Sequence, residues 1–192
     1  MRVAIINNGV SHPTRIISLL KDAEVKVFDF SQSKEVLSSK FDFIILTGSS
    51  QFPIIYNEEK LEDEVRLIQE SSVPILGICY GCELIAFAFG GTLKDTQVRR
   101  QDLITIQTIK DDTIFEGKKI FTAYDAHRWT IESLPEEIEV LAISEHGAEI
   151  IRHTTRPIYG FQFHPEKMLE ESSGDELFYS FRKKYLSAFD TE

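Results

Sequence analysis

The sequence has few cysteines and no long apolar run. Its 192 residues include only two cysteines, Cys79 and Cys82, fewer than a secreted domain held together by disulfides normally carries. No segment approaches the roughly 20 apolar residues that span a bilayer. The opening residues, MRVAIINNG, lack the apolar region and cleavage site of a signal peptide. We therefore expect a cytoplasmic protein with no membrane partner.

Basic residues are also scarce. The 21 lysines and arginines face 31 acidic residues, which gives a net charge of −10. Non-specific nucleic-acid binding needs a basic surface that neutralises phosphates, so we expect no nucleic-acid partner. The charge still allows a local basic pocket for an anion, for which Arg99-Arg100 is a candidate.

The length of the chain, 192 residues, suits one domain, so we expect residues 1–192 to form a single domain. The first half of the chain alternates β and α patterns. Short β-branched runs predict strands, and apolar residues at helical spacing predict helices. This order predicts a parallel sheet with helices on both faces. The expected strands are 2–6, 25–30, 41–49 and 74–78, and the expected helices are 14–21, 33–40, 57–70 and 79–89, the last ended by Gly90-Gly91.

The second half has strand patterns linked by short turns, which predict an antiparallel extension of the same sheet. These strands are 104–109, 119–124, 139–144, 148–153 and 157–163, and a helix at 174–186 closes the chain. The predicted fold class is therefore α/β, with a mostly parallel open sheet, helices on both faces and an antiparallel extension in the C-terminal half.

The most informative segment runs from Gly77 to Gly81, between the fourth predicted strand and its helix. Its pattern of glycine, nucleophile and glycine is typical of a nucleophile elbow, a turn so sharp that glycines are needed. The elbow would present Cys79 at the carboxyl end of a parallel strand, where open α/β sheets carry their sites. We expect the helix N-terminus to favour the reactive thiolate and the Tyr80 N–H to stabilise an oxyanion.

Two other interpretations of Cys79 are open. Free cysteine is among the most buried residue types, so Cys79 could be structural. Cys79 and Cys82 also form a C-x-x-C pair at a helix start near βαβ units, which is typical of thioredoxin-like redox proteins. A glycine elbow is not part of that redox motif, and thioredoxin-like domains are shorter than this chain.

A second polar motif follows the strand at 157–163, which runs into His164, Pro165 and Glu166. Pro165 fixes the backbone between the two polar residues. With extended geometry their side chains would lie on one face, so Glu166 could hold one ring nitrogen of His164 while the other faces Cys79. A base oriented by a carboxylate beside a nucleophile is the logic of a catalytic triad. Without the cysteine elbow, the motif would indicate only a strand end.

Together the two segments resemble the class I, triad-type glutamine amidotransferases. The resemblance runs almost the full length and is carried by PILGICYG at 74–81 and YGFQFHPE at 159–166. Within this family the chain is most similar to the amidotransferase subunits of GMP synthetases, which match it at Asn8-Gly9, Leu134-Pro135 and Gly174. The resemblance implies a flavodoxin-like fold and glutamine as substrate.

The resemblance also implies a mechanism. The Cys79 thiolate attacks the side-chain amide of glutamine, His164 protonates the leaving ammonia, and a γ-glutamyl thioester forms. Water activated by His164 then releases glutamate. Backbone N–H groups of Tyr80 and of the loop at Gly48 and Ser49 would hold the oxyanion.

The chain departs from the family in the oxyanion loop. The family usually has Gly-Gly-Pro, and this chain has Gly48-Ser49-Ser50. A glycine suits the position of Ser49 because the backbone must turn its N–H inward, often with an unusual φ. We therefore expect either backbone strain at Ser49 or a remodelled oxyanion hole.

Further departures fall among the expected substrate-binding residues, Glu83, Ala126 and His127. Glu83 replaces a glutamine that helps to hold the substrate, and its carboxylate would suit an ammonium group. The family usually has Ser-His-x-Asp, of which His127 keeps the histidine, Ala126 replaces the serine and Trp129 replaces the aspartate. These changes are consistent either with tolerated variation or with a changed substrate.

The sequence contains no P-loop that would use the ammonia, so the resemblance implies that the partner is a separate, ATP-dependent synthetase subunit. One alternative is a free-standing γ-glutamyl hydrolase or peptidase with the same triad, which Glu83 and Trp129 would suit. A non-enzymatic relative that only binds is another. We expect no organic cofactor and no metal, because the histidines outside the triad lack metal-ligand spacing.

Overall fold

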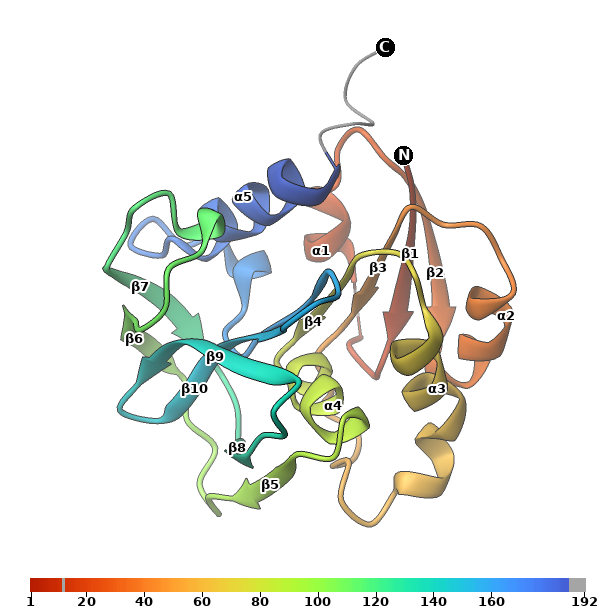
Figure 1. The fold of residues 1–192 in the computed structure, drawn as a ribbon, viewed down its shortest axis with the longest axis horizontal. Coiled ribbons are helices and arrows are strands. Elements are labelled where there is room, and N and C mark those ends of the chain that lie inside the picture. The colour runs from red at the N-terminus through yellow and green to blue at the C-terminus, as the bar shows by residue number, and fades with distance from the viewer. Residues whose placement is uncertain (12, 187–192) are drawn as a thin grey trace.

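The computed structural model describes residues 1–11 and 13–186, and a nine-stranded sheet forms the centre of that part. The strands cross the sheet in the order β2, β1, β3, β4, β11, β10, β9, β6 and β7 (Figure 1). In that order their bounds are Glu24–Asp29, Arg2–Asn7, Phe43–Leu46, Ile75–Ile78, Ile158–Phe161, Gly147–His153, Ile138–Ser144, Asp102–Thr108 and Ile120–Asp125.

The first five strands of that order run parallel to one another. Strands β3, β4 and β11 are buried at every residue, and β1 is buried over Val3–Ile6. Strands covered on both faces need apolar side chains on both, which explains their β-branched runs. Because the strands are parallel, their carboxyl ends meet at one edge of the sheet, the lower edge in Figure 1.

Helices cover both faces of the sheet, which confirms the predicted α/β class. One face carries α1 and α5, whose apolar side chains share a core with one side of the strands. The other face carries α2, α3 and α4, which belong to a second core. The helix bounds are Thr14–Ser18 for α1, Ser33–Leu37 for α2, Glu62–Glu70 for α3, Tyr80–Ala88 for α4 and Gly174–Leu186 for α5.

Three helices are shorter than predicted by three residues or more, and α4 is shorter by one residue at each end. α1 ends at Ser18 and α2 at Leu37, and turns follow both. The predicted helix at 57–70 begins as a 3₁₀ turn over Glu58–Leu61 and is α-helical only from Glu62. Helix α5 has the bounds that the sequence predicts.

The predicted antiparallel extension is present in β10, β9, β6 and β7. The prediction was wrong for the strand at 157–163, because β11 pairs with β4 in parallel. β11 also pairs with β10, in antiparallel fashion. Because β10 has the opposite direction to β4, the turn between β10 and β11 gives β11 the same direction as β4.

A second, two-stranded sheet was not predicted. It pairs β5 (Thr92–Asp95) with β8 (Trp129–Ser133) in antiparallel fashion. Both strands are short and half exposed, so neither has the apolar run that indicates a strand. This small sheet lies below β9 and β10 in Figure 1, close to the carboxyl edge of the parallel strands.

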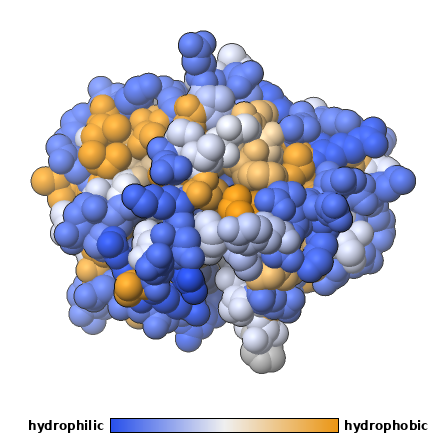
Figure 2. All heavy atoms as spheres, turned by 90° about the horizontal axis from the view of Figure 1, so that it is seen from below, coloured by the Kyte–Doolittle hydropathy of each residue, from blue (hydrophilic) through white to orange (hydrophobic). Residues whose placement is uncertain are grey.

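Figure 2 views the molecule from that carboxyl edge. Hydrophobic atoms gather in patches across the middle and upper part of this face, and hydrophilic residues surround them. Among the described residues, none of the helices has both the length and the apolar character needed to cross a membrane.

Candidate active site

Cys79 lies between the last residue of β4 and the first residue of α4. Its φ of 52° and ψ of −106° fall in a region that non-glycine residues rarely adopt, as expected for a nucleophile elbow. The turn needs its glycines: a Cβ at Gly77 would lie 2.3 Å from the backbone oxygen of Gly81. A Cβ at Gly81 would lie 2.4 Å from the backbone oxygen of Leu46. The structure therefore contains the predicted elbow.

His164 lies near the elbow because β11 is the parallel neighbour of β4, with Phe161 opposite Ile78. The backbone N–H of Cys79 donates to the carbonyl of Phe161 at 2.7 Å. Beyond the strand end, the backbone N–H of His164 donates to the carbonyl of Tyr124 on β7 at 2.8 Å. The strand pairing thus brings the two motifs to one edge of the sheet.

Glu166 holds the imidazole ring of His164, with 2.7 Å between Oε1 and Nδ1. The extended geometry we predicted for this contact is wrong, because β11 ends at Phe161 and Pro165–Lys167 forms a 3₁₀ turn. Proline suits the first position of a helical turn, where its missing N–H costs nothing. The turn brings the carboxylate back to the ring, so the two side chains meet by another route.

The thiol of Cys79 is buried and donates a hydrogen bond to the carbonyl oxygen of Ala126 at 3.8 Å. Burial raises the pKa of this thiol well above its usual range, and the charges of Glu83 and Asp125 raise it further. The backbone N–H of Tyr80 has a smaller, opposite effect on that pKa. In this conformation burial and the nearby carboxylates therefore outweigh the expected effect of the helix N-terminus, and the thiol form of Cys79 is favoured.

The Nε2 atom of His164 is buried and has no hydrogen-bond partner among the described residues. His164 and Cys79 both adjoin Gly48: a Cβ built there would lie 3.5 Å from His164 Cε1 and 3.8 Å from Cys79 Cβ. The candidate base and nucleophile are therefore neighbours, but the thiol bonds to Ala126 and not to His164.

The loop after β3 carries two of the candidate oxyanion residues, Gly48 and Ser49. The hydroxyl of Thr47 donates to the carbonyl of Gly48 at 2.9 Å. Because a trans peptide points its N–H opposite to its C=O, the N–H of Ser49 points away from Thr47. Ser49 has no positive φ, so the strain considered at this position is absent. The third candidate, Tyr80, begins α4, where N–H groups lack a carbonyl partner within the helix.

Two cavities meet at the nucleophile, one of about 540 Å³ and one of about 270 Å³. Only the larger reaches Glu83 and His127, and only the smaller reaches His164 and Glu166. The residues that line both are Ser49, Ser50, Cys79, Arg99 and Ala126. Arg99, one of the two arginines singled out in the sequence, therefore lines the same two cavities as the nucleophile.

Glu83 lines the larger cavity although it is only 5% exposed. The Nε2 atom of Gln162 donates to its Oε1 at 3.0 Å. Burial raises the pKa of Glu83 to about 7, against the opposite effect of that hydrogen bond. Glu83 thus changes charge near neutral pH. Gln162 was not predicted as a site residue, although it lies within the second motif.

His127 lines the larger cavity beside Ala126. Its Nε2 lies 3.0 Å from Oδ2 of Asp125, and its Nδ1 contacts the carbonyl oxygen of Trp129. Burial alone would lower the pKa of His127, but the hydrogen bond and charge of Asp125 outweigh burial and raise it. Sequence reasoning missed Asp125, whose spacing of two residues from His127 on a strand end was the available sign.

Glu149 joins Asp125 and His127 in a buried cluster whose ligand atoms lie within 4.8 Å of one another, a spacing that could hold a metal ion. The sequence did not predict this cluster, because Glu149 lies on β10 and is distant in sequence from Asp125 and His127. Burial raises the pKa of Glu149 to about 8, and the Ser144 hydroxyl donates to its Oε1 at 2.6 Å. The contact between Asp125 and His127 and the raised pKa of Glu149 both reduce the negative charge of this cluster.

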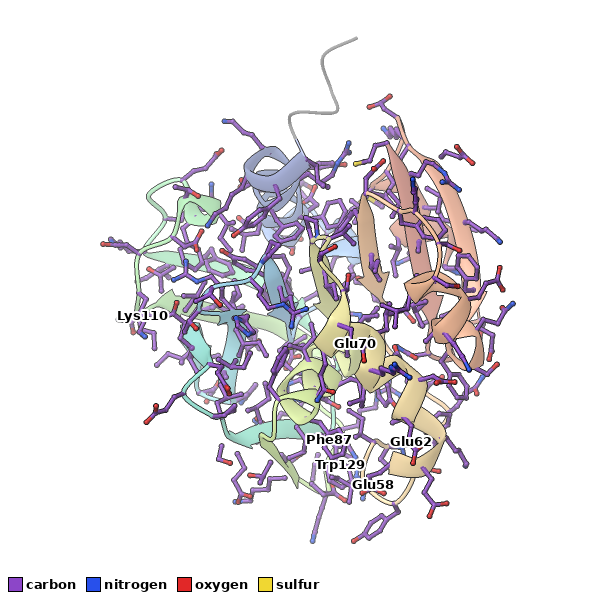
Figure 3. All side chains as sticks on the ribbon, turned by 45° about the vertical axis from the view of Figure 1, so that its right-hand side comes forward. Glu58, Glu62, Glu70, Phe87, Lys110 and Trp129 are labelled. Atoms are coloured by element: carbon purple, nitrogen blue, oxygen red, sulfur yellow. The ribbon has the colours of Figure 1, made fainter. Side chains whose placement is uncertain are left out.

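The small sheet walls the larger cavity. Arg128, which directly precedes β8, donates from Nε and Nη2 to the two carboxylate oxygens of Asp95 at the end of β5, both at 2.7 Å. Trp129, Arg128 and Asp95 all line the cavity. Trp129 lies at the lower end of the molecule in Figure 3, the end to which the parallel strands run. Because this sheet was not predicted, the wall it forms was not predicted either.

Cys82 belongs to a different environment from Cys79. A Cβ at Gly160 on β11 would lie 2.6 Å from its Sγ, so the thiol packs against that strand. Cys82 is fully buried, lines neither cavity, and both cysteines are free. The arrangement gives no support to the redox interpretation.

Comparisons with known proteins agree with this geometry. The family model for glutamine amidotransferase class-I matches residues 4–184. Relatives include a glutamine-hydrolyzing GMP synthase subunit of Methanocaldococcus jannaschii, 32% identical over 94% of this chain and 96% of that protein. The protein of the same name from Methanococcus maripaludis is 34% identical over 95% of this chain and 96% of its own length.

Solved structures share the fold. A protein described as a GMP synthase subunit from Thermoplasma acidophilum superposes with a TM-score of 0.86, at 26% identity over 99% of this chain and 96% of that chain. A glutamine amidotransferase from Thermotoga maritima has a TM-score of 0.69 at 18% identity, over 100% of this chain and 86% of that chain, and supports the fold alone. This chain belongs to the class-I glutamine amidotransferase family.

Proposed function

We propose that this chain hydrolyses glutamine to glutamate and ammonia and supplies the ammonia to a separate, ATP-dependent GMP synthetase subunit. The observation that carries the chemistry is the strained elbow at Cys79 beside the hydrogen-bonded pair of His164 and Glu166. The partner follows from the relatives named as glutamine-hydrolyzing GMP synthase subunits, which match this chain over nearly its whole length.

Acylation begins when the thiol of Cys79 turns from Ala126 to the free Nε2 of His164 and passes its proton to it. The thiolate attacks the γ-carbonyl carbon of glutamine, and the carbonyl oxygen becomes an oxyanion. His164 then returns the proton to the leaving nitrogen, the C–N bond breaks, and ammonia leaves a γ-glutamyl thioester. Glu166 fixes the ring for both transfers through its bond to Nδ1.

Backbone donors from two elements would hold the oxyanion. The N–H of Tyr80 is free of helical pairing at the start of α4. The N–H of Ser49 points away from Thr47, whose hydroxyl fixes the preceding carbonyl. Preorganised donors of this kind stabilise charge without reorganisation during the reaction. In the second half-reaction, water gives a proton to His164, attacks the thioester and releases glutamate.

The larger cavity would hold the α-amino and α-carboxylate groups of glutamine. Glu83 offers a carboxylate to the ammonium group, and its pKa of about 7 leaves it substantially charged at neutral pH. Ala126 and His127 line the same cavity, where the raised pKa of His127 favours a positive charge. This arrangement suits a zwitterionic amino-acid substrate.

The resting thiol makes the isolated chain a slow enzyme in this proposal, because acylation must first break the bond to Ala126. A synthetase subunit that contacts the cavity mouth would favour the rotated thiol. We also propose that residues 1–192 act as one domain, since the main sheet contains strands from both halves of the chain. We further propose that this domain acts in the cytoplasm.

The test is glutamate release from glutamine by the purified chain, alone and with a GMP synthetase partner subunit. We expect release in both cases, faster with the partner, together with glutamine-dependent GMP formation. Cys79→Ala should abolish release, and Cys82→Ala should retain it because Cys82 lines neither cavity.

The controls separate the chemistry from the partner. If glutamine turnover is undetectable, covalent labelling of Cys79 by a diazoketone analogue of glutamine reports whether the site recognises the substrate. Turnover that survives Cys79→Ala, or the absence of both turnover and labelling, contradicts the proposed reaction. Turnover without GMP formation contradicts only the proposed partner.

A further inference from the structure

The smaller cavity lies on the side of Cys79 from which the leaving nitrogen must depart. His164 and Glu166 line this cavity and do not line the larger one. Because His164 protonates the leaving nitrogen in the proposed reaction, that nitrogen must face the smaller cavity. Its volume is about 270 Å³. Ammonia is close to water in size, and a water molecule needs only roughly 30 Å³. The space is therefore far larger than glutamine hydrolysis requires.

The lining of the smaller cavity is mainly positive, whereas the whole chain is negatively charged. Arg15, Arg99 and Lys167 line it, and the one acidic residue of its lining, Glu166, is bonded to His164. None of the three cations makes an ion pair within residues 1–11 and 13–186. The chain carries a net charge of −10, so three uncompensated cations around one cavity are a local exception.

The cations come from three separate elements. Arg15 lies on α1, Arg99 follows β5, and Lys167 ends the 3₁₀ turn after His164. Nζ of Lys167 lies 5.1 Å from the centre of the Tyr124 ring, which also packs edge-on against His164 at 6.4 Å. A cation–π contact of this kind holds the ammonium group near the general acid.

We propose that the chain also hydrolyses γ-glutamyl amides whose leaving amine carries a carboxylate, such as γ-glutamyl amino acids. This inference rests on the proposed thioester chemistry at Cys79. The γ-glutamyl half occupies the larger cavity as glutamine does. The amino-acid half occupies the smaller cavity, where its carboxylate meets Arg15 and Lys167.

The reaction balances with water as the only co-substrate. The sulfur of Cys79 bonds to the γ-carbonyl carbon, the C–N bond breaks, and His164 gives its proton to the departing nitrogen. A free amino acid leaves in place of ammonia. Water then attacks the thioester, His164 takes its proton, and the Cys79 thiol and glutamate are regenerated.

The experiment compares kcat/KM for γ-glutamylglycine and γ-glutamylisobutylamide, whose leaving amines have equal numbers of heavy atoms and differ in the carboxylate. We expect about a tenfold preference for γ-glutamylglycine, because its carboxylate can form charge-assisted hydrogen bonds that the uncharged amine cannot form. The double variant Arg15→Met, Lys167→Met should remove that preference. Lys21→Met, an exposed lysine that lines neither cavity, should preserve it.

The readout is the ratio of kcat/KM for the two amides. A substitution that slows acylation of both amides equally leaves this ratio unchanged. The proposal is overturned if glutamine is hydrolysed but γ-glutamylglycine is not, or if the preference persists in the double variant. Loss of glutamine hydrolysis and of Cys79 labelling would instead overturn the underlying chemistry. High salt should weaken the preference in the unmodified chain, because it screens the exposed Arg15.

Discussion

The thiol of Cys79 hydrogen-bonds to the carbonyl oxygen of Ala126 at 3.8 Å and not to His164, whose Nε2 has no partner among the described residues. Catalytic hydrogen bonds are often absent before substrate binds and form only in the Michaelis complex. Here the backbone at Cys79 is already set in the elbow conformation, while the hydrogen bond between the thiol and His164 is not formed. The chain is therefore built for the reaction but rests with a protonated nucleophile.

The first prediction concerns the reactivity of that thiol. Because burial and the nearby carboxylates raise the pKa of Cys79, its alkylation by iodoacetamide should accelerate with every increase in pH up to pH 9. Mass spectrometry should locate the label on Cys79, and Cys82→Ala should give the same profile. A rate that levels off below pH 8 would show that the thiolate already forms at neutral pH.

The second prediction concerns the orientation of the base. Glu166→Gln keeps the size of the side chain but removes the charge that steadies His164 at 2.7 Å. We expect kcat for glutamine to fall by about 10² to 10⁴, with little change in unfolding temperature. Glu170→Gln, an exposed neighbour in sequence, is the matched control and should be close to unchanged. Equal activity of the two variants would remove Glu166 from the triad.

The third prediction concerns the pH dependence of substrate binding. If the Glu83 carboxylate receives the ammonium group of glutamine, KM should fall as pH rises through about 7, where Glu83 ionises. Glu83→Gln should make KM independent of pH over pH 6–8. The same variant should speed alkylation of Cys79, because the charge of Glu83 raises the pKa of that thiol.

Gln162 provides the comparison for Glu83. Its amide donates to the carboxylate at 3.0 Å and belongs to the same buried wall, but it carries no charge. Gln162→Leu should raise the pKa of Glu83 further and move the fall in KM to higher pH. A KM profile that is the same in the unmodified chain and in Glu83→Gln would assign the ammonium group to another residue.

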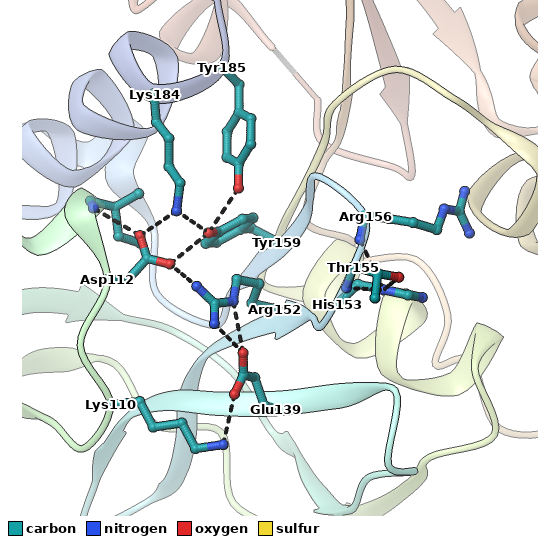
Figure 4. Close-up of polar contacts among 11 residues, drawn as sticks. Lys110, Asp112, Glu139, Arg152, His153, Thr155, Arg156, Tyr159, Lys184 and Tyr185 are labelled. Carbon is teal, nitrogen blue, oxygen red and sulfur yellow. Dashed lines mark hydrogen bonds and ion pairs between the residues drawn. The ribbon is translucent and has the colours of Figure 1, made fainter.

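The fourth prediction concerns a polar network that fastens α5 to the sheet. Figure 4 shows Asp112 bonded to Arg152, Tyr159 and Lys184, with Lys184 at 2.7 Å and Tyr159 at 2.8 Å. The side chain of Asp112 is fully buried, which would raise its pKa, but the hydrogen bonds from Lys184, the backbone of Ile114 and Tyr159 outweigh burial and hold that pKa below the usual range. Asp112→Asn should therefore lower the free energy of unfolding by about 2–3 kcal/mol at pH 7.

The sign of this effect is fixed by the lowered pKa. The stabilisation is present above the pKa of an unfolded aspartate and disappears as pH falls through the folded value, so the variant and the unmodified chain should converge below pH 4. Asp111→Asn is the control, since Asp111 is exposed and its ion pair with Lys119, at 2.6 Å, lies on the surface. A difference that persists in acid would point to lost packing and not to charge.

The site residues that stand out in the sequence are those whose chemistry is concentrated in a short segment. Cys79 stands out through its flanking glycines, and His164 and Glu166 stand two residues apart. Each of these patterns records a local constraint, either a sharp turn or a fixed backbone. The contact between the two segments follows from the pairing of β4 with β11, which buried apolar runs suggest but do not specify.

The parts that were missed depend on contacts between distant segments. Glu149 reaches Asp125 from β10, and neither carries a sequence pattern that distinguishes it from a solvated acid. Strands β5 and β8 are stable through each other and through the bond between Arg128 and Asp95, not through apolar runs of their own. The pKa of Cys79 was misjudged because burial and neighbouring charge outweigh the helix N-terminus, and both are properties of the folded chain.

The last prediction concerns Glu64, a fully buried carboxyl on α3. The side-chain amide of Asn8 donates to its Oε1 at 3.0 Å, and the backbone N–H of Asn8 donates to the Thr47 hydroxyl at 2.9 Å. Burial raises the pKa of Glu64 to about 8 from an ordinary value of 4.5. Asn8 therefore joins the loop after β1 to the loop that carries the candidate oxyanion donors, and Glu64 holds the side chain of Asn8.

A carboxyl whose pKa is higher in the folded protein binds more protons when folded than when unfolded between those two values. Its contribution to stability is complete below pH 4.5 and declines as pH rises to about 8. Glu64→Gln keeps the acceptor for Asn8 and removes this titration, so the variant should lose less unfolding free energy between pH 5 and 8, by at least about 1 kcal/mol. Glu62→Gln, an exposed neighbour on α3, should leave the slope unchanged. Equal slopes in the two variants would mean that Glu64 is charged in the folded protein, and that the oxyanion loop is held beside a buried anion.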